Sequence, residues 1–237
     1  MPLIEVTDLR KRYGNRVAVD GVSFSVERGE IFGILGTNGA GKTTTVECVE
    51  GLRQADAGEL SVLGLNPATD RAALTRRVGV QLQESRLPAK LRVREALELF
   101  ASFYPNPADV DLLLEQLDLR DHARSYFGKL SGGQKQRVSI ALALVGNPEL
   151  AILDELTTGL DPHARRDTWK LVEGIRDAGV TVLLVTHFMD EAERLCDRVA
   201  IFDAGQVVAT GTPAELRATA GESTLDDAFV SLTRSAR

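Results

Sequence analysis

The sequence predicts an α/β fold: a mainly parallel β-sheet flanked by helices, with antiparallel strands near the N-terminus and an inserted α-helical subdomain. Apolar runs that alternate with amphipathic stretches over residues 148–215 predict parallel strands joined by helices. Alternating apolar and polar residues before position 35 predict half-buried strands, and apolar residues at helical spacing fill much of 84–147. We therefore expect a single domain with a core at 1–83 and 148–215, a helical subdomain at 84–147 and a short tail at 216–237.

The strands near the N-terminus are predicted from the period of their apolar residues. Val22, Phe24 and Val26 alternate with serines, which is the pattern of a strand with one buried face. A turn then leads into a fully apolar run at 31–35, which predicts a strand buried on both faces. A helix is expected to follow at about 42–49.

The middle of the chain changes to helical spacing. Val93, Leu97, Phe100 and Phe103 recur every three or four residues, and prolines at 105 and 107 interrupt the pattern. Strands and helices alternate again beyond residue 148. The expected strands are 150–153, 180–185 and 198–202, the expected helices are 163–178 and 189–196, a hairpin turn is expected at 203–206, and an amphipathic helix at 225–232.

A glycine-rich segment between the apolar strand and its helix predicts a nucleotide site. Residues 36–43, GTNGAGKT, fit the P-loop pattern GxxxxGK[ST] in its required strand–loop–helix context. Backbone N–H groups of such a loop surround phosphate oxygens, Lys42 reaches the β- and γ-phosphates, and the Thr43 hydroxyl binds Mg²⁺. The predicted ATP-binding residues here are Gly36, Thr37, Asn38, Gly39, Ala40, Gly41, Lys42, Thr43 and Thr44.

An acidic pair follows the apolar strand at 150–153. Ligands bind at the carboxyl ends of strands in open parallel sheets, so Asp154 is placed to hold Mg²⁺ through water. Glu155 is the candidate to accept a proton from attacking water. The alternative, that the pair only caps the next element, is disfavoured by the P-loop in the same chain.

A second glycine motif, Leu130-Ser131-Gly132-Gly133-Gln134, stands where a helix is expected to begin. Ser131 and Gln134 have the spacing of a capping box. Each glycine costs roughly 0.5–1 kcal/mol against alanine in a helix, which is reasonable if a phosphate must approach the backbone closely. Since the P-loop already holds the phosphates, the two motifs are expected to face each other across an interface between subunits.

The segment 130–137, LSGGQKQR, resembles the signature of ATP-binding-cassette (ABC) ATPases, and the similarity extends over nearly the whole chain. In that family the signature of one subunit closes over the γ-phosphate held by its partner's P-loop. The resemblance implies that Ser131, Gly132, Gly133 and Gln134 contact ATP. It also implies that Tyr13 stacks on adenine, Gln83 acts in catalysis and binds Mg²⁺, Asp161 belongs to the D-loop, and His187 contacts the γ-phosphate as a catalytic residue.

Several of these residues have a structural alternative. Tyr13 could be an edge-strand aromatic, and Gln81 competes with Gln83 if the strand register differs. Asp161 followed by Pro162 has the pattern of a helix N-cap, a role compatible with an interface role. His187 could be a core histidine at the end of an apolar strand. His122 and His163 match no motif and are expected at the surface.

Composition argues against several other classes of protein. The net charge of −6 argues against a nucleic-acid partner. Cys48 and Cys196 lie far apart without a CxxC pair, which favours a reducing, cytoplasmic compartment. The N-terminal residues lack a signal-peptide pattern, and no apolar run approaches the roughly 20 residues of a membrane span.

The sequence therefore predicts an ATPase subunit that powers a separate membrane permease from the cytoplasmic side. By resemblance, two subunits, expected to be identical, would bind two ATP molecules head to tail with Mg²⁺. Residues 224–233 resemble the tails of drug- and polysaccharide-exporter ATPases, which favours export over import. DNA-repair ABC ATPases separate the two motifs by long coiled coils, and translation-associated members carry two cassettes. A non-catalytic module is disfavoured by the presence of Glu155 and His187.

Overall fold

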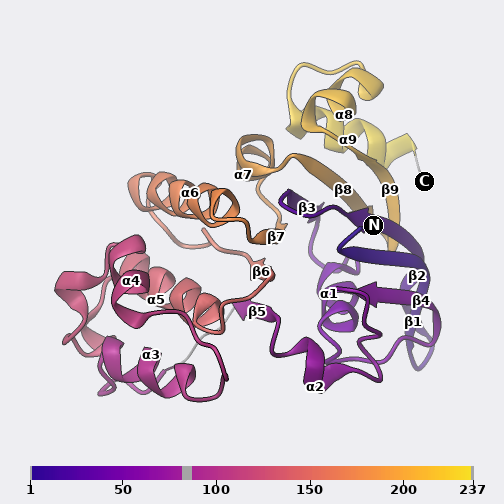
Figure 1. Cartoon of the computed structure of the whole chain (residues 1–237). Helices are drawn as coiled ribbons and strands as arrows, with labels where there is room; N and C mark the ends of the chain where they lie inside the picture. Colours follow the sequence, from indigo (N-terminus) through magenta and orange to yellow (C-terminus); the bar gives the residue numbers. More distant parts are fainter. Residues whose placement is uncertain (1, 82–86, 236–237) are drawn as a thin grey trace. The chain divides into compact units, whose positions relative to one another are not determined.

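The computed structural model describes residues 2–81 and 87–235, and the chain divides into two compact units. The first, which we call the terminal unit, contains residues 1–75 and 183–237. The second, the central unit, contains residues 76–182. Figure 1 shows the helices and strands of both units.

The terminal unit begins with an antiparallel sheet in the order β2-β1-β4. Its strands are β1 (Ile4–Tyr13), β2 (Arg16–Val26) and β4 (Ala57–Val62). Gly14 and Asn15 form the turn between β1 and β2, so that Tyr13 pairs directly with Arg16. The residues predicted to alternate do so: Val22, Phe24 and Val26 are buried. The expected antiparallel strands are therefore confirmed.

The same unit contains the strand and helix on either side of the P-loop. In β3 (Ile31–Gly36) every residue is buried, and it pairs in parallel with β8 (Arg198–Asp203). β8 continues through a tight turn into the antiparallel strand β9 (Gln206–Gly211), which confirms the predicted hairpin. The helix after the P-loop, α1 (Lys42–Val49), has the predicted bounds. Phe24 stacks on Phe32 with a centroid distance of 5.5 Å in the core of this unit.

The remaining helices of the terminal unit are α2 (Arg71–Leu74), α7 (Met189–Leu195), α8 (Pro213–Ala220) and α9 (Leu225–Ser235). The predicted C-terminal helix is thus present, and it buries Leu225, Ala228 and Phe229. It packs against α7 and α8, and α8 and α9 lie together at the yellow end of the chain in Figure 1. Within the described residues, none of the helices in either unit combines the length and apolar character that a membrane span requires.

The central unit combines two parallel strands with helices. β5 (Val78–Gln81) pairs with β6 (Leu150–Asp154), and β7 (Thr181–Thr186) crosses the boundary between the units. Between β5 and β6 the described residues form α3 (Val93–Ala101), α4 (Val110–Gln116), the short 3₁₀ helices η1 (Arg120–His122) and η2 (Phe127–Lys129), and α5 (Gly132–Leu144). The helical break predicted at the two prolines lies between α3 and α4.

The last helix of the central unit is α6 (Pro162–Asp177), one residue from the predicted bounds at each end. It contains Trp169, the single tryptophan of the chain, with the Arg165 guanidinium 5.8 Å from the centre of its ring. Val172 and Ile175 are buried, while the opposite face of the helix is polar. α6 is therefore an amphipathic helix with one face in the core of its unit.

Candidate functional site

The P-loop connects β3 to α1 within the terminal unit, and close backbone packing explains two of its glycines. A Cβ on Gly36 would lie 2.5 Å from the Phe202 carbonyl oxygen of the neighbouring strand. Gly41 has φ +98°, and a Cβ there would lie 2.6 Å from the Ala18 carbonyl oxygen. Only glycine fits these two positions without moving backbone. The loop is therefore held against β2 and β8.

The turn between β8 and β9 fixes the loop from a second side. Gly205 N donates to the Ala40 carbonyl oxygen at 3.1 Å, and Asp20 N donates to the Gly205 carbonyl oxygen at 2.8 Å. These two bonds connect β2, the hairpin turn and the P-loop. Residues 37–39 at the tip of the loop are exposed, whereas Ala40 is buried. The base of the loop is thus rigidly placed and its tip faces solvent.

Lys42 closes the loop through its side chain. Its Nζ donates to the carbonyl oxygens of Gly36 at 2.8 Å and Thr37 at 3.0 Å, and the residue is buried. The N-cap of α1 is Gly41, which has no side chain, so the first N–H groups of the helix are not covered by a capping side chain. Thr43 lies exposed in the first turn. An ammonium, a helix N-terminus and a hydroxyl at one loop are the groups that bind a nucleoside phosphate and its Mg²⁺.

The β1–β2 hairpin places an aromatic and a cation near this loop. Tyr13 is 40% exposed at the end of β1, with the Arg53 guanidinium 5.0 Å from its ring centre. Arg16, its partner across the hairpin, lies beside the tip of the P-loop, because a Cβ on Gly39 would be 3.6 Å from Arg16 Nη2. Sequence reasoning missed Arg16, since only the hairpin register brings it to the loop.

His187 directly follows β7 in the terminal unit. The residue is partly exposed, and its ring centre lies 4.1 Å from that of Phe188. Phe188 N in turn donates to Thr186 Oγ1 at 3.0 Å, which shapes the backbone after the strand. His187 is therefore not enclosed in the core, which weakens the alternative of a core histidine.

The acidic pair lies at the end of β6 in the central unit. Asp154 and Glu155 are both partly exposed, and Glu155 has a positive φ of +48°. The Asp154 backbone N–H donates to Gln81 Oε1 at 3.1 Å. Gln81 is buried, so it has a structural role at the junction of β5 and β6. Gln83, the preferred candidate for the catalytic glutamine, lies outside the described residues.

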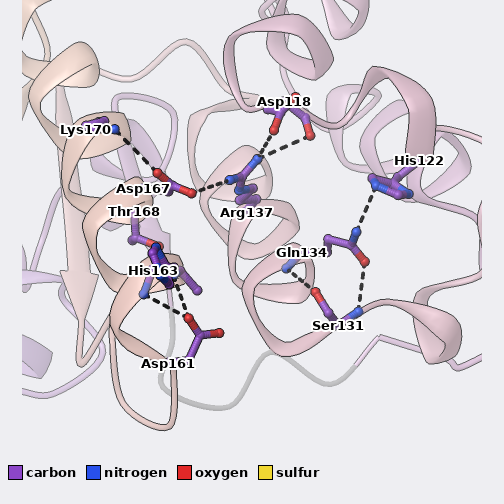
Figure 2. Close-up of polar contacts among 11 residues, drawn as sticks. Asp118, His122, Ser131, Gln134, Arg137, Asp161, His163, Asp167, Thr168 and Lys170 are labelled. Carbon is purple, nitrogen blue, oxygen red and sulfur yellow. Dashed lines mark hydrogen bonds and ion pairs between the residues drawn. The ribbon is translucent and has the colours of Figure 1, made fainter.

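The second glycine motif begins α5 as the predicted capping box. Ser131 N donates to Gln134 Oε1 at 2.9 Å, and Gln134 N donates to Ser131 Oγ at 3.3 Å (Figure 2). Among the described residues, the N–H groups of Gly132 and Gly133 have no acceptor. The capping box therefore satisfies the amides on either side of the glycines and leaves two neighbouring donors at the positive end of a 13-residue helix.

Packing within the chain explains these glycines only in part. A Cβ on Gly133 would lie 3.3 Å from Ala164 Cβ, which is tight. A Cβ on Gly132 would lie 3.8 Å from Leu160 Cδ2, an ordinary contact, and Gly132 is exposed. The chain itself does not require glycine at 132, so its absence of a side chain fits the close approach of an external anion.

Side chains behind the motif support it in ways that sequence reasoning missed. His122 Nε2 lies 2.8 Å from Gln134 Nε2, so this partly buried histidine is not the surface residue expected, whereas His163 is exposed as expected. The Arg137 guanidinium contacts Asp118 and lies 3.8 Å from Asp167 of α6. Figure 2 shows both groups of contacts around the first turns of α5. Local sequence carries no signal for either pairing, because the partners come from other elements.

Asp161 caps α6 as the Asp-Pro pattern predicted. Its Oδ1 accepts from Ala164 N at 3.0 Å and His163 N at 2.9 Å. These bonds from Ala164 and then His163 lower the pKa of the Asp161 carboxyl. The residue is exposed, so the cap leaves its second carboxylate oxygen at the surface. The cap role is confirmed, and the interface role remains a prediction.

The predicted residues thus form two groups. Tyr13, the P-loop and His187 belong to the terminal unit, while Asp154, Glu155, the motif at 130–134 and Asp161 belong to the central unit.

Comparisons with known proteins agree with this set of motifs. Residues 19–158 match the family described as ABC transporter. The chain belongs to the ABC transporter family.

Relatives of this ABC protein include ATP-binding proteins named for export and for drug resistance. It is 44% identical over 216 residues to Nod factor export ATP-binding protein I of Burkholderia orbicola (strain AU 1054), covering 89% of this chain and 71% of that protein. It is 40% identical over 228 residues to daunorubicin resistance ATP-binding protein DrrA3 of Streptomyces coeruleorubidus, covering 94% of this chain and 72% of that protein.

Solved ABC structures have the same fold. One described as the ATP-binding subunit of an ABC transporter is 33% identical with a TM-score of 0.86, covering 98% of this chain and 99% of that one. A dimeric post-hydrolysis state of an ATP-binding cassette bound to ADP and Pi is 26% identical with a TM-score of 0.78, covering 88% and 98%. The predicted fold class and ATPase activity are therefore confirmed: the chain is an ATP-binding, ATP-hydrolysing ABC cassette.

Proposed function

We propose that this cassette powers an exporter as one of two identical ATPase subunits bound to a separate membrane permease on the cytoplasmic side. The observation that carries the proposal is the pair of amides at Gly132 and Gly133 that have no acceptor within residues 2–81 and 87–235, and these would give the chain a second phosphate-binding feature besides its P-loop. Two subunits arranged head to tail would give each nucleotide one P-loop and one partner signature. The relatives named for Nod factor export favour export over import.

Each predicted residue has a role in this proposal. Tyr13 stacks on adenine, Lys42 and the P-loop amides hold the phosphates, and the partner's signature amides face the γ-phosphate. Glu155 orients water and accepts its proton, while His187 contacts the γ-phosphate. Asp161 lies at the subunit interface. Arg16 adds positive charge at the exposed tip of the P-loop.

The donor set of the chain fits Mg²⁺. The exposed Thr43 hydroxyl and the Asp154 carboxylate are oxygen ligands, which Mg²⁺ prefers together with nucleotide phosphates. Gln83 is the third proposed ligand. When bound, Mg²⁺ would neutralise charge that develops on the β- and γ-phosphate oxygens. The protein residues then need only position the phosphates and the attacking water.

The experiment that tests the proposal replaces Glu155 with glutamine. Glu155→Gln keeps the size of the side chain but removes the proton acceptor, so we expect hydrolysis to fall by roughly 10²-fold or more. ATP binding should persist, and a dimer should accumulate with ATP in sedimentation velocity. Glu59→Gln, an exposed change on β4, is the matched control and should keep full turnover. Turnover within a few-fold of wild type in Glu155→Gln would rule out the assigned base.

The export assignment needs the permease. The tagged chain, isolated from membranes of its source cells, should recover an integral membrane protein, and the recovery should not depend on nucleic acid. Recovery of ribosomes or DNA instead would favour one of the non-transport ABC functions. The direction of transport then follows from whether vesicles that contain the complex accumulate or release substrate.

A further inference from the structure

We propose that His122 is a positioning residue for the signature motif: its neutral ring, with the proton on Nδ1, accepts a hydrogen bond from Gln134 and thereby holds the Gly132 and Gly133 amides in place for the partner's nucleotide. The inference rests on the proposed function, because it concerns the site that two subunits complete. It adds a residue outside the motif, at the end of a different element, η1.

The orientation of the Gln134 amide fixes the direction of the bond. Its Oε1 accepts from the Ser131 backbone N–H at 2.9 Å, and a backbone N–H can only donate. The Nε2 group of Gln134 therefore faces His122 Nε2, 2.8 Å away. Since an amide NH₂ is a donor, the ring nitrogen must be the acceptor and carries no hydrogen.

The contact between His122 and Gln134 is the first in a short series of hydrogen bonds that leads to the two glycines. His122 orients the Gln134 amide, the amide oxygen caps Ser131 N, and Ser131 begins the helix whose next two residues are the glycines (Figure 2). Gly132 and Gly133 are flexible residues at a helix start, so fixing their neighbours lowers the cost of ordering them around an anion. Donors already in place stabilise charge better than donors that must reorganise.

The charged side chains near His122, apart from Asp121, contact other groups. On the elements that meet here, η1 contributes Arg120 and Asp121, α4 contributes Glu115, the segment between α4 and η1 contributes Asp118, and α5 contributes Lys135 and Arg137. Arg120 pairs with Glu115 at 3.1 Å, and Asp118 pairs with Arg137. The Lys135 ammonium lies 5.7 Å from the centre of the Phe127 ring. None of these contacts involves the His122 ring, so none competes with Gln134 for it.

The first test measures the tautomer directly. Ring ¹⁵N shifts of His122 in the full chain, assigned by their loss in His122→Ala, should show a protonated Nδ1 and an unprotonated Nε2 at neutral pH. In Gln134→Ala the ring should lose this preference, because its donor is gone. A ring protonated at Nε2 in the wild-type chain would overturn the proposal without any assay of activity.

The second test measures the subunit interface. In the Glu155→Gln background with saturating ATP, His122→Ala should weaken each composite site by about threefold to tenfold, the usual effect of one lost hydrogen bond. With two identical sites, the dimer dissociation constant should rise by about tenfold to a hundredfold. His122→Gln, which retains an acceptor, should restore most of the affinity. The exposed neighbour change Asp121→Ala is the matched control and should have no effect.

Two controls separate a positioning role from loss of folding. Binding of a fluorescent ATP analogue to the monomer, which depends on the P-loop, should stay within about twofold of the parent. The double variant His122→Ala/Gln134→Ala should be no weaker than Gln134→Ala alone, since His122 acts through Gln134. Additive effects, or a dimer indifferent to His122→Ala, would overturn the inference. Absence of an ATP-dependent dimer in the Glu155→Gln parent would instead overturn the proposed function together with it.

Discussion

At the scale of single residues, the two signature glycines differ in what surrounds them. Gly133 lies against Ala164 of α6, so internal packing alone explains part of the need for a small residue at this position. Gly132 has room for a methyl group and is exposed. A substitution at 132 can therefore test whether nucleotide contact requires a glycine without disturbing the packing of the chain. A substitution at 133 would change both.

Gly132→Ala should leave the chain as stable as wild type or slightly more stable, because alanine is the better helix former and meets no close atom. The same methyl group would project at the amides that we assign to the partner's phosphate, so hydrolysis should fall by roughly tenfold or more. Urea unfolding and steady-state phosphate release measure the two effects. Full activity with unchanged stability would show that position 132 does not face a ligand.

At the scale of elements, Gln81 connects two parallel strands. Its buried side chain accepts from Asp154 N at the end of β6, directly before Glu155. The strand β5 therefore helps to fix the backbone from which both acidic side chains extend. Gln81 therefore has a structural role directly beside the two acidic residues. This role explains why an otherwise apolar strand ends in a glutamine.

Gln81→Leu keeps the approximate size of the side chain but leaves the Asp154 N–H without this acceptor. We expect the free energy of unfolding to fall by about 1–3 kcal/mol, the usual cost of removing a buried partner. Chemical denaturation followed by circular dichroism measures the change. Gln116→Leu, at an exposed position on α4, should alter stability by less than about 0.5 kcal/mol. Equal stability of Gln81→Leu and wild type would mean that the bond contributes nothing.

Elements with strong local signals were predictable from the sequence. The buried strand β3, helix α1 and the α5 capping box all follow from periodicity or from paired capping residues. Strand β4 was not predictable. Gly58 interrupts any alternation of apolar and polar residues, and β4 pairs with β1, which is more than 40 residues away in the sequence. The contacts of His122, Arg16 and Gln81 were missed for a related reason: each depends on the register of separate elements rather than on local pattern.

At the scale of the whole molecule, nucleotide binding must stabilise the folded chain. Any ligand that binds only the folded state at a concentration of about 100 times its Kd contributes about 2.7 kcal/mol to the free energy of unfolding. A substitution of Lys42 is the simplest way to remove this stabilisation by nucleotide, since the Gly36 and Thr37 carbonyl oxygens hold its Nζ at the loop.

Lys42→Ala should therefore abolish the upward shift in Tm that ATP and Mg²⁺ produce in the wild-type chain. The relevant quantity is the difference with and without ATP, because loss of the two loop bonds also lowers the starting Tm. Lys170→Ala, whose side chain is 74% exposed on α6, should keep the full shift. An ATP-induced shift in Lys42→Ala as large as that of wild type would contradict the assigned role of the P-loop lysine.

The single tryptophan on α6 also has a practical consequence. Trp169 lies two turns beyond the Asp161 cap, with Arg165 near its ring, and the rest of the sequence has no second indole. Fluorescence excited at a wavelength that tyrosine no longer absorbs thus comes from Trp169 alone, on one helix of the central unit. The wild-type chain is its own optical probe: emission changes on mixing with ATP would report on α6 in real time, without a dye or an engineered label.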